Sequence, residues 1–344
     1  MSKLRVLYVL RQYPQASQTY IENELRELGP ECEPIIAAMG DPDAPYREHL
    51  PFQKLTGPQL AELVARTKPD VLHTHWMLMV PFLGALSKQF GIPFTVRSHS
   101  FESMVPEGSA LPPFLAQAKP YVQSALCLKV FCMPFTHSSL ARAGVPEQKL
   151  EEYYPIVNVS RFSDRTPNGE DVMNIGACAP KKKMEDFVDL AVKLRGKRNF
   201  TLYALPGPAN ELAVVDAYNK RQGSPVRVSP TVEPEQMLGE YKRHGWLVYT
   251  ACPRINQVGW PLSIGEAMAA GVGVCMPLIR PDIRDFIGDA GYIYEDIREV
   301  SELVLQPPAA DMRERGFERA KVFDVKKSVA ALLATWRKAV AASA

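Results

Sequence analysis

A short run in the second half of the sequence, PLSIGEAMAAGVGVCMP (261–277), joins a helical pattern that carries one carboxylate to an apolar strand. Pro261 precedes the helical pattern, and Gly271 falls where a helix commonly ends in a left-handed residue. The first amides of such a helix have no partner within it, so they attract an anionic group such as a phosphate. Two explanations remain for Glu266: a ligand-facing carboxylate, or half of a Ser263–Glu266 capping box that serves only the helix.

A second group of candidate residues is the lysine-rich turn in NIGACAPKKK (174–183). Gly176 lies near the end of an apolar run, and Lys181 and Lys182 follow it in a turn after Pro180. Cations placed at the end of a strand suit an anionic ligand, whereas lysines in a loop are also common as solvated charges. The sequence leaves both explanations open.

Histidines form the third group. His73 and His75 are two residues apart on an expected strand and therefore share a face, as do Arg97 and His99 on the next one. A metal site needs a third ligand and a second shell of partners, and the sequence shows neither, so we expect no metal. The alternative to a functional role is that these histidines are satisfied at strand ends.

The elements that must position these residues alternate along the chain between short apolar runs and amphipathic helical patterns, which is typical of parallel sheets covered by helices. We expect strands at residues 4–10, 33–38, 70–75, 93–98 and 125–131 in the first half, and at 172–177, 199–205, 225–229, 246–250, 272–277 and 291–294 in the second. This pattern predicts two open α/β domains, with a ligand in the cleft between the carboxyl ends of their two sheets.

The polar segment VSRFSDRTPNGEDV (159–172) indicates a linker between the two halves. We therefore predict an N-terminal domain at 1–163 and a C-terminal domain at 170–322. The amphipathic segment within 323–344 is expected to cross back to the first domain as a helix.

Composition limits the functions open to the chain. Its 344 residues are 46% apolar, which excludes a disordered chain, and the net charge of +2 argues against a protein that coats nucleic acid. The six cysteines contain no CxxC pair, so neither a zinc ribbon nor a disulfide framework is expected.

No signal peptide or long apolar run is recognisable, so we expect a soluble, cytoplasmic protein. The segment WMLMVPFLGALSKQF (76–90) is apolar enough to be a buried helix. A weak peripheral membrane contact through the same segment is the alternative.

The stretch GWPLSIGEAMAAGVGVCMP (259–277) resembles the C-terminal signature of family 4 retaining glycosyltransferases. Six further segments resemble landmarks of the exopolysaccharide members of that family, in the same order: YPQASQTYIENEL (13–25), DVLHTHW (70–76), PFTVRSHSFE (93–102), FTHSSLARAGVPEQKLEEYYPIVNVSRF (135–162), NIGACAPKKKMEDFVDLA (174–191) and DIRDFIGDAGYIY (282–294). The resemblance covers nearly the whole chain. It implies two facing Rossmann-like domains of GT-B type, with a nucleotide-sugar donor on the second and an acceptor on the first.

For the second domain, the resemblance implies that Glu266 holds the donor ribose hydroxyls and that Ser263 and Ile264 meet the diphosphate at the helix start. Lys182, in the turn after Gly176 and beside Lys181, would neutralise the departing diphosphate. No cofactor or metal is implied beyond the donor itself, a nucleoside diphosphate-sugar of the UDP or GDP type.

For the first domain, the resemblance implies that His99 faces the donor sugar. Family members bring a glycine-rich turn to the phosphates near the start of the chain, and this sequence has no glycine between Leu10 and Leu28. Gln15, Ser17 and Thr19 would have to act there through side chains or amides. The alternative for this region is a Thr19–Glu22 capping box that serves only the helix.

Two positions depart from the family pattern. Ala177 stands where an arginine is usual, and Val258, eight residues before Glu266, stands where the first glutamate would meet the donor sugar. Asn256 or Gln257 could reach the same space. We expect a retaining glycosyltransferase acting on a glycan, lipid-linked or small-molecule acceptor; the alternatives are a nucleotide-sugar epimerase and a donor-binding pseudoenzyme or partner subunit.

Overall fold

The computed structural model describes residues 3–43, 46–104, 109–207, 210–229, 231–255 and 257–343. The chain divides into two compact units. The first contains residues 3–43, 48–104, 109–154 and 325–343, and the second contains residues 155–324 within the described ranges, together with Tyr46 and Arg47. Residues 155–163, which we expected in the first domain, therefore pack with the second unit.

The first unit is built on a parallel sheet with strand order β3-β2-β1-β4-β5-β6-β7. Its strands are β1 (Leu4–Leu10), β2 (Cys32–Ala38), β3 (Gln53–Lys54), β4 (Val71–His75), β5 (Phe94–Arg97), β6 (Cys127–Cys132) and β7 (Leu150–Glu152). The central strands are buried on both faces, which explains their nearly continuous apolar sequences.

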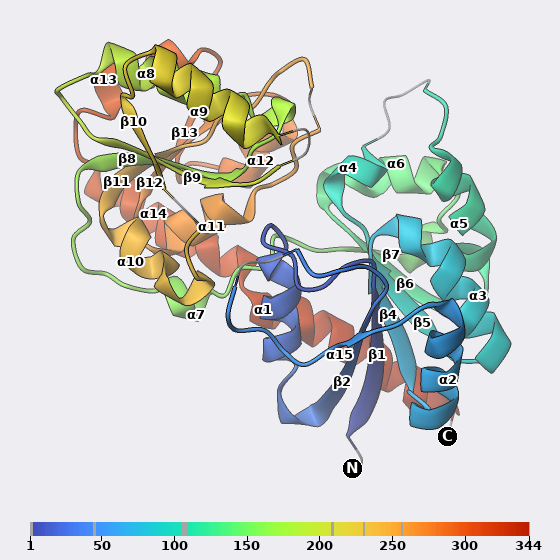
Figure 1. Ribbon diagram of the computed structural model, residues 1–344. Coiled ribbons are helices and arrows are strands. Elements are labelled where there is room, and N and C mark those ends of the chain that lie inside the picture. Colours follow the sequence, from blue (N-terminus) through green and yellow to red (C-terminus); the bar gives the residue numbers. More distant parts are fainter. Residues whose placement is uncertain are drawn as a thin grey trace. The chain divides into compact units, whose positions relative to one another are not determined.

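Helices cover both faces of this sheet. They are α1 (Thr19–Glu27), α2 (Gly57–Thr67), α3 (Val80–Phe90), α4 (Ser100–Ser103), α5 (Pro113–Gln123), α6 (His137–Arg142) and α15 (Val325–Ser343), with short 3-10 turns η1 (Gly29–Glu31), η2 (Met77–Met79), η3 (Pro134–Thr136) and η4 (Glu147–Lys149). Helix α15, drawn in red in Figure 1, packs beside α1. The last helix of the chain therefore completes the first unit.

The second unit has a parallel sheet with strand order β10-β9-β8-β11-β12-β13. Its strands are β8 (Asp171–Ala177), β9 (Phe200–Leu205), β10 (Val226–Ser229), β11 (His244–Val248), β12 (Gly273–Pro277) and β13 (Tyr292–Tyr294). In both sheets the chain winds outward in one direction and then in the other, which is the doubly wound Rossmann order. The predicted fold of two Rossmann-like parallel-sheet domains is confirmed.

Helices α8 and α9 lie on one face of the second sheet, and α11 and α14 lie on the other (Figure 1). The helices of this unit are α7 (Val159–Phe162), α8 (Glu185–Lys193), α9 (Glu211–Arg221), α10 (Met237–Lys242), α11 (Leu262–Ala269), α12 (Asp282–Ile287), α13 (Val300–Leu303) and α14 (Ala310–Ala320), with turns η5 (Pro180–Lys182), η7 (Pro234–Gln236), η8 (Ile297–Glu299) and η9 (Lys321–Phe323).

Each strand expected from the sequence is present, with ends that differ by at most two residues. The apolar segment 76–90 forms η2 and α3, and Val80, Leu83 and Leu86 are buried in the core of the first unit. Its composition is thus explained by burial, and the peripheral membrane contact stays a prediction. Within the described residues, none of the helices combines the length and apolar character that a membrane span requires. All six cysteines are unpaired, and only Cys252 is not buried.

Candidate functional site

The carboxyl ends of β8 and β11 lie side by side at the point where the winding of the second sheet reverses. Ligands of open α/β sheets bind at such switch points, outside the carboxyl ends of the strands. The loop after β8 carries Lys181 and Lys182, and the loop after β11 leads into α11 with Ser263 and Glu266. The fold therefore brings the predicted donor-binding segments to the same edge of one sheet.

Lys182 reaches back into this edge from turn η5. Its ammonium donates to the hydroxyl of Tyr249, and Nζ lies 4.2 Å from the centroid of the Tyr249 ring. Burial, together with the neighbouring charge of Lys181, lowers the pKa of Lys182 to about 7. A Cβ at position 176 would come within 3.2 Å of Lys182 Nζ, and Gly176 has a φ of 149°, so this strand end requires glycine.

Lys181 points toward the loop that precedes α11. Its Nζ donates to the carbonyl of Gln257 at 3.5 Å, and burial lowers its pKa. Gln257 is exposed, whereas Val258 is buried and its carbonyl accepts a hydrogen bond of 2.5 Å from Arg280 Nη1. Two cations thus hold the backbone of the segment in which the sequence departs from the family pattern. The candidate Asn256 lies outside the described residues.

Helix α11 begins at Leu262, with Pro261 as its N-cap and no side-chain cap. Ser263 therefore lies inside the first turn, and the Ser263–Glu266 capping box considered as an alternative is not formed. Ser263 is partly exposed and Ile264 is buried. Gly271, just after the helix, has a φ of 75°, as the sequence predicts. In the first turn, the N–H of Ile264 donates to the carbonyl of Pro261 at 3.2 Å, and the remaining first-turn N–H groups have no acceptor further back in the helix.

Glu266 makes its hydrogen bond to a different element. The hydroxyl of Tyr241, at the end of α10, donates to Glu266 Oε2 at 2.9 Å. Burial raises the pKa of Glu266 to about 7, although the Tyr241 hydrogen bond and the charge of Arg161 both oppose the shift. The residue as a whole is partly exposed. Glu266 is thus a poorly hydrated carboxyl group that does not serve its own helix, which suits a ligand-binding role.

The first unit contains a second polar group, built across neighbouring strands. Tyr8 of β1 pairs in register with His73 of β4, and His73 pairs with Thr95 of β5. His75 and Arg97 form the next register pair along the same two strands. Because side chains two residues apart share a face, these five residues line one face of the sheet, and all five are buried.

Glu24 of α1 lies at the centre of this polar face. Its Oε1 is 3.0 Å from the hydroxyl of Tyr8, 3.2 Å from His75 Nε2 and 3.4 Å from His73 Nε2. Its Oε2 forms an ion pair of 2.6 Å with Arg97 Nη2. Burial alone would raise the pKa of Glu24, but Arg97 and then His75 hold it well below its usual range.

Arg97 compensates this charge in an apolar setting. Its guanidinium carbon lies 4.4 Å from the ring centroid of Tyr153 and 5.2 Å from that of Phe131, so it stacks on two aromatic rings. Among the described residues, neither its Nε nor its Nη1 has a hydrogen-bond acceptor. The Glu24 ion pair and the two rings therefore hold Arg97 in place.

His99 caps the short helix α4 at the carboxyl end of β5 and is 7% exposed. Its Nε2 lies 3.0 Å from His75 Nδ1, and its ring centroid lies 4.2 Å from that of Trp76 and 4.8 Å from that of Tyr20. Burial holds the pKa of His99 well below its usual range. The ring is therefore an internal, neutral part of the first unit.

Trp76 and its turn are held by a second buried carboxylate. Glu102 accepts hydrogen bonds from the backbone N–H groups of Met77 at 2.5 Å, Leu78 at 3.2 Å and His99 at 3.2 Å. Burial raises the pKa of Glu102 to about 7, although these three hydrogen bonds act to lower it. Trp76 itself has a φ of 82°, which is strained for a bulky residue.

The N-terminal candidates Ser17 and Thr19 stay predictions. Thr19 is the first residue of α1 and Gln18 is its N-cap, so a Thr19–Glu22 capping box is not formed. Glu22 instead accepts hydrogen bonds from the hydroxyl of Tyr13 and from Arg26. Ser17 is exposed and Thr19 is partly exposed, so both can reach a ligand.

Glu24, His73 and His75 place their ligand atoms within 4.8 Å of one another and could hold a metal ion. The third group that the sequence did not show is Glu24, and Thr95 Oγ1 lies behind His73 at 2.7 Å. Electrostatics nevertheless disfavour an ion here: Arg97 already neutralises Glu24, so a divalent cation would add two uncompensated charges to a fully buried site.

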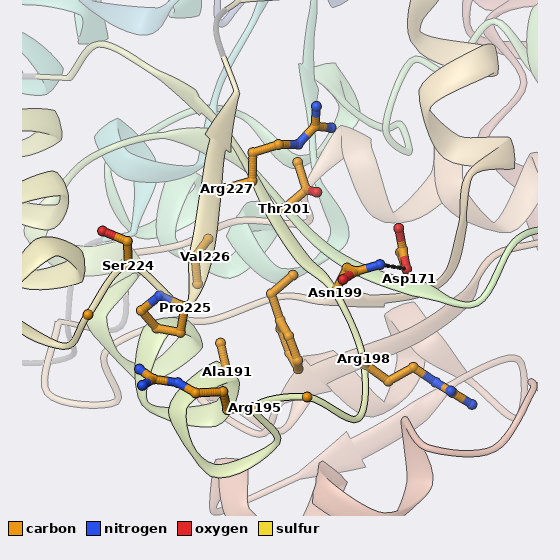
Figure 2. Close-up of a pocket in the computed structure, with 13 residues that line it drawn as sticks. Asp171, Ala191, Arg195, Arg198, Asn199, Thr201, Ser224, Pro225, Val226 and Arg227 are labelled. Carbon is orange, nitrogen blue, oxygen red and sulfur yellow. Dashed lines mark hydrogen bonds between the residues drawn. The ribbon is translucent and has the colours of Figure 1, made fainter.

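A pocket of about 770 Å³ lies at the opposite edge of the second sheet, around the first residues of β8, β9 and β10. Figure 2 shows that its three arginines, Arg195, Arg198 and Arg227, point in different directions. Arg195 donates to the carbonyl of Gln222 and Arg198 to that of Leu305, each at 2.5 Å. These side chains hold backbone segments rather than converge on one ligand, so we do not place the site here.

Several residues of these groups were missed by the sequence-based reasoning. Tyr241 and Tyr249 carried no signal, because each contacts its partner only through the tertiary fold. Glu24 did carry one: in YIENELREL it lies three residues after Ile21 and so falls on the buried face of α1. A carboxylate on that face indicates a buried polar partner.

The sequence matches no known family model and no curated protein. Solved structures do match. HepE from Anabaena in complex with UDP and glucose has a TM-score of 0.75 at 14% identity, over 96% of this chain and 100% of that one. Sucrose-phosphate synthase from Thermosynechococcus elongatus has a TM-score of 0.75 at 15% identity, over 99% and 100% of the two chains. A glycosyltransferase from Rickettsia africae has a TM-score of 0.70 at 15% identity, over 99% of each chain.

These structures are GT-B glycosyltransferases, and at such low identity the likeness establishes the fold. The protein has the two Rossmann-like domains of the GT-B class. Its activity is a separate question, which the residues at the switch point address.

Proposed function

We propose that the protein is a retaining GT-B glycosyltransferase that moves a sugar from a nucleoside diphosphate-sugar to a glycan, lipid-linked or small-molecule acceptor. The observation that carries the proposal is that Lys182, the open start of α11 and the Glu266 carboxyl lie at the same carboxyl edge of the second sheet. The complexes of HepE with UDP and with UDP-glucose support this choice of ligand class.

In this proposal, the first turn of α11, at Ser263 and Ile264, binds the diphosphate through backbone N–H groups. Glu266 accepts hydrogen bonds from the ribose hydroxyls. Tyr241 holds one carboxylate oxygen and leaves the other for the ligand. Each of these groups is preorganised by a contact within the second unit, so binding requires little reordering.

Departure of the diphosphate from the anomeric carbon creates negative charge, which Lys182 is placed to stabilise. With a pKa of about 7 in the free protein, its amine gains a proton most readily when the anion is bound. The acceptor hydroxyl then attacks the same face of the sugar from which the diphosphate leaves, and its proton passes to the departing diphosphate oxygen. The anomeric configuration is thereby retained. Lys181, Lys182 and the helix amides supply the positive charge, so the reaction as proposed uses no metal or other cofactor.

The test is a product analysis with the full chain. We expect that one of a panel of UDP- and GDP-sugars is consumed only when an oligosaccharide or lipid-linked acceptor is present. The proton NMR spectrum should show a glycoside with the anomeric configuration of the donor, and the rate should be unchanged by EDTA. A new nucleotide sugar formed without acceptor would indicate an epimerase. Nucleotide binding without turnover across the panel would indicate a pseudoenzyme, and loss of activity that only added metal restores would overturn the metal-free mechanism.

A further inference from the structure

A series of close polar contacts runs from the C-terminal helix to His99 inside the first unit, and each is a hydrogen bond except the 3.4 Å contact between His73 Nε2 and Glu24 Oε1. Trp336 Nε1 of α15 donates to Thr95 Oγ1 at 2.9 Å, and Thr95 Oγ1 lies 2.7 Å from His73 Nδ1. His73 faces Glu24, Glu24 faces His75, and His75 faces His99. All groups in this series of contacts are buried, so water cannot replace a missing partner. In each contact one group must therefore carry the proton and the other must accept it.

At the Trp336 end of the series, the chemistry of the groups determines which atom carries each proton. An indole nitrogen can only donate, so the Thr95 hydroxyl accepts from Trp336 and has its own proton to give to His73 Nδ1. A neutral imidazole that accepts at Nδ1 carries its proton on Nε2. His73 therefore directs Nε2–H toward Glu24.

The carboxylate decides the remaining protons. An ionised carboxylate only accepts, so His75 donates Nε2–H to Glu24 and keeps a lone pair on Nδ1. That lone pair accepts the proton on His99 Nε2, 3.0 Å away. The other nitrogen of His99 faces the backbone N–H of Glu102 in the capping box of α4. Both nitrogens of the ring are thus used inside the first unit.

Charge balance supports the same assignment. Glu24 carries one negative charge and Arg97 one positive charge, so a further charge on any of the three histidines would be uncompensated in a buried site. The pKa of His73 is lowered to about 4 by burial, and burial likewise lowers the pKa of His75 and of His99.

We propose that Glu24 and His75 are positioning residues that fix the proton and the ring of His99, so that His99 enters the reaction as a neutral, oriented ring and not as a proton acceptor. Only the part of His99 in a reaction rests on the proposed function. The proton assignment itself concerns the free protein.

Long-range proton–nitrogen NMR spectra of the full chain labelled with ¹⁵N-histidine test the assignment without any turnover. We expect His73, His75 and His99 as neutral Nε2–H tautomers between pH 6 and pH 8 (about one unit either side of neutral). In His75→Phe the Nε2–H signal of His99 should move or exchange with water. In the matched variant His73→Phe, which removes a histidine that does not contact His99, it should stay in place.

A charged or Nδ1–H His99 in the unmodified protein would overturn the proposal, as would metal-shifted nitrogen signals with stoichiometric bound metal. Either result would leave the proposed transferase activity standing. With the accepted donor, His99→Gln keeps an N–H for His75 and should retain more turnover than His99→Phe. A proton acceptor contributes about 10²–10⁴-fold to rate, so a loss of that size, equal in both variants, would contradict a neutral role.

Discussion

The hydroxyl of Tyr241, near the end of α10, donates to Oε2 of Glu266, in the middle of α11, at 2.9 Å. This contact separates two explanations that the sequence alone leaves open. A capping glutamate would turn back to the first amides of its own helix, whereas Glu266 is held from outside that helix. The carboxyl group is thereby fixed beside the open helix start and remains partly exposed.

The first prediction concerns pH and Glu266. Because the folded-state pKa is raised from 4.5 to about 7, the folded protein keeps a proton that the unfolded chain has already released within that range. This group therefore makes the protein less stable as pH rises from about 5 to about 7. Glu266→Gln cannot ionise, so its stability relative to the parent should increase by about 1–2 kcal/mol from pH 5 to pH 8, after discounting for partial exposure.

Urea unfolding at several pH values measures this difference. The exposed Glu48 provides a matched control, and Glu48→Gln should leave the pH dependence of the parent unchanged. A pH-independent difference between Glu266→Gln and the parent would mean that this carboxyl is ionised in the folded protein throughout the range.

The second prediction concerns Lys182. Lys182→Met should lower turnover by about 10²-fold while changing donor affinity much less, because the charge matters most as the diphosphate departs. The same variant should melt at a higher temperature near neutral pH, since it removes an amine whose protonated form is disfavoured by burial.

Lys183 is the control for this pair of measurements. It is exposed and paired with Asp186 at 2.9 Å, so Lys183→Met should retain turnover. If Lys181→Met lost turnover to the extent expected for Lys182→Met, and Lys182→Met lost none, the neutralising role would belong to Lys181.

The third prediction tests the buried ion pair of the first unit. Arg97→Met leaves Glu24 charged and buried without compensation, so it should cost about 3–5 kcal/mol of unfolding free energy. Adding Glu24→Gln removes that charge and should recover a large part of the loss. Chemical denaturation of the two single variants and the double variant gives the coupling. Additive losses would show that the two residues do not interact.

The fourth prediction concerns the sugar. Val258 is buried and cannot accept a hydrogen bond, whereas Gln257 is exposed on the same segment. We expect one nucleotide sugar to bind more tightly than its bare nucleoside diphosphate, with Gln257→Ala or Asn256→Ala losing about 1–3 kcal/mol of that difference. The prediction fails if no nucleotide sugar binds better than the bare diphosphate and neither variant changes the preference among nucleotide sugars. This segment would then not recognise a donor sugar.

The central strands were predictable because burial on both faces leaves long apolar runs. Strands β3 and β7 were missed, since they have two and three residues, lie at the sheet edges and carry exposed charged or polar side chains such as Lys54 and Glu152. Edge pairing of that kind depends on the neighbouring strand rather than on local sequence.

The candidate site residues likewise divide into those that a local sequence pattern marks and those that no local pattern marks. Gly176, Lys182 and Glu266 were proposed from local motifs, and their roles stay predictions. The hydrogen-bond partners of Glu266 and Lys182 come from a separate helix and from the end of another strand, so no local pattern marks them. The polar cluster around Glu24 joins three strands with α1, and α15 reaches it through Trp336, so only the packed unit reveals it.

Titration calorimetry of the full chain with UDP and with GDP tests the central claim, that the second unit binds a nucleoside diphosphate through the start of α11 and Glu266. We predict that at least one of the two binds the parent protein, and that Glu266→Ala weakens this binding by about 1–3 kcal/mol, or about 5- to 150-fold, while remaining folded. Absence of binding by both nucleotides, or equal affinity in the parent and in Glu266→Ala, would contradict the account.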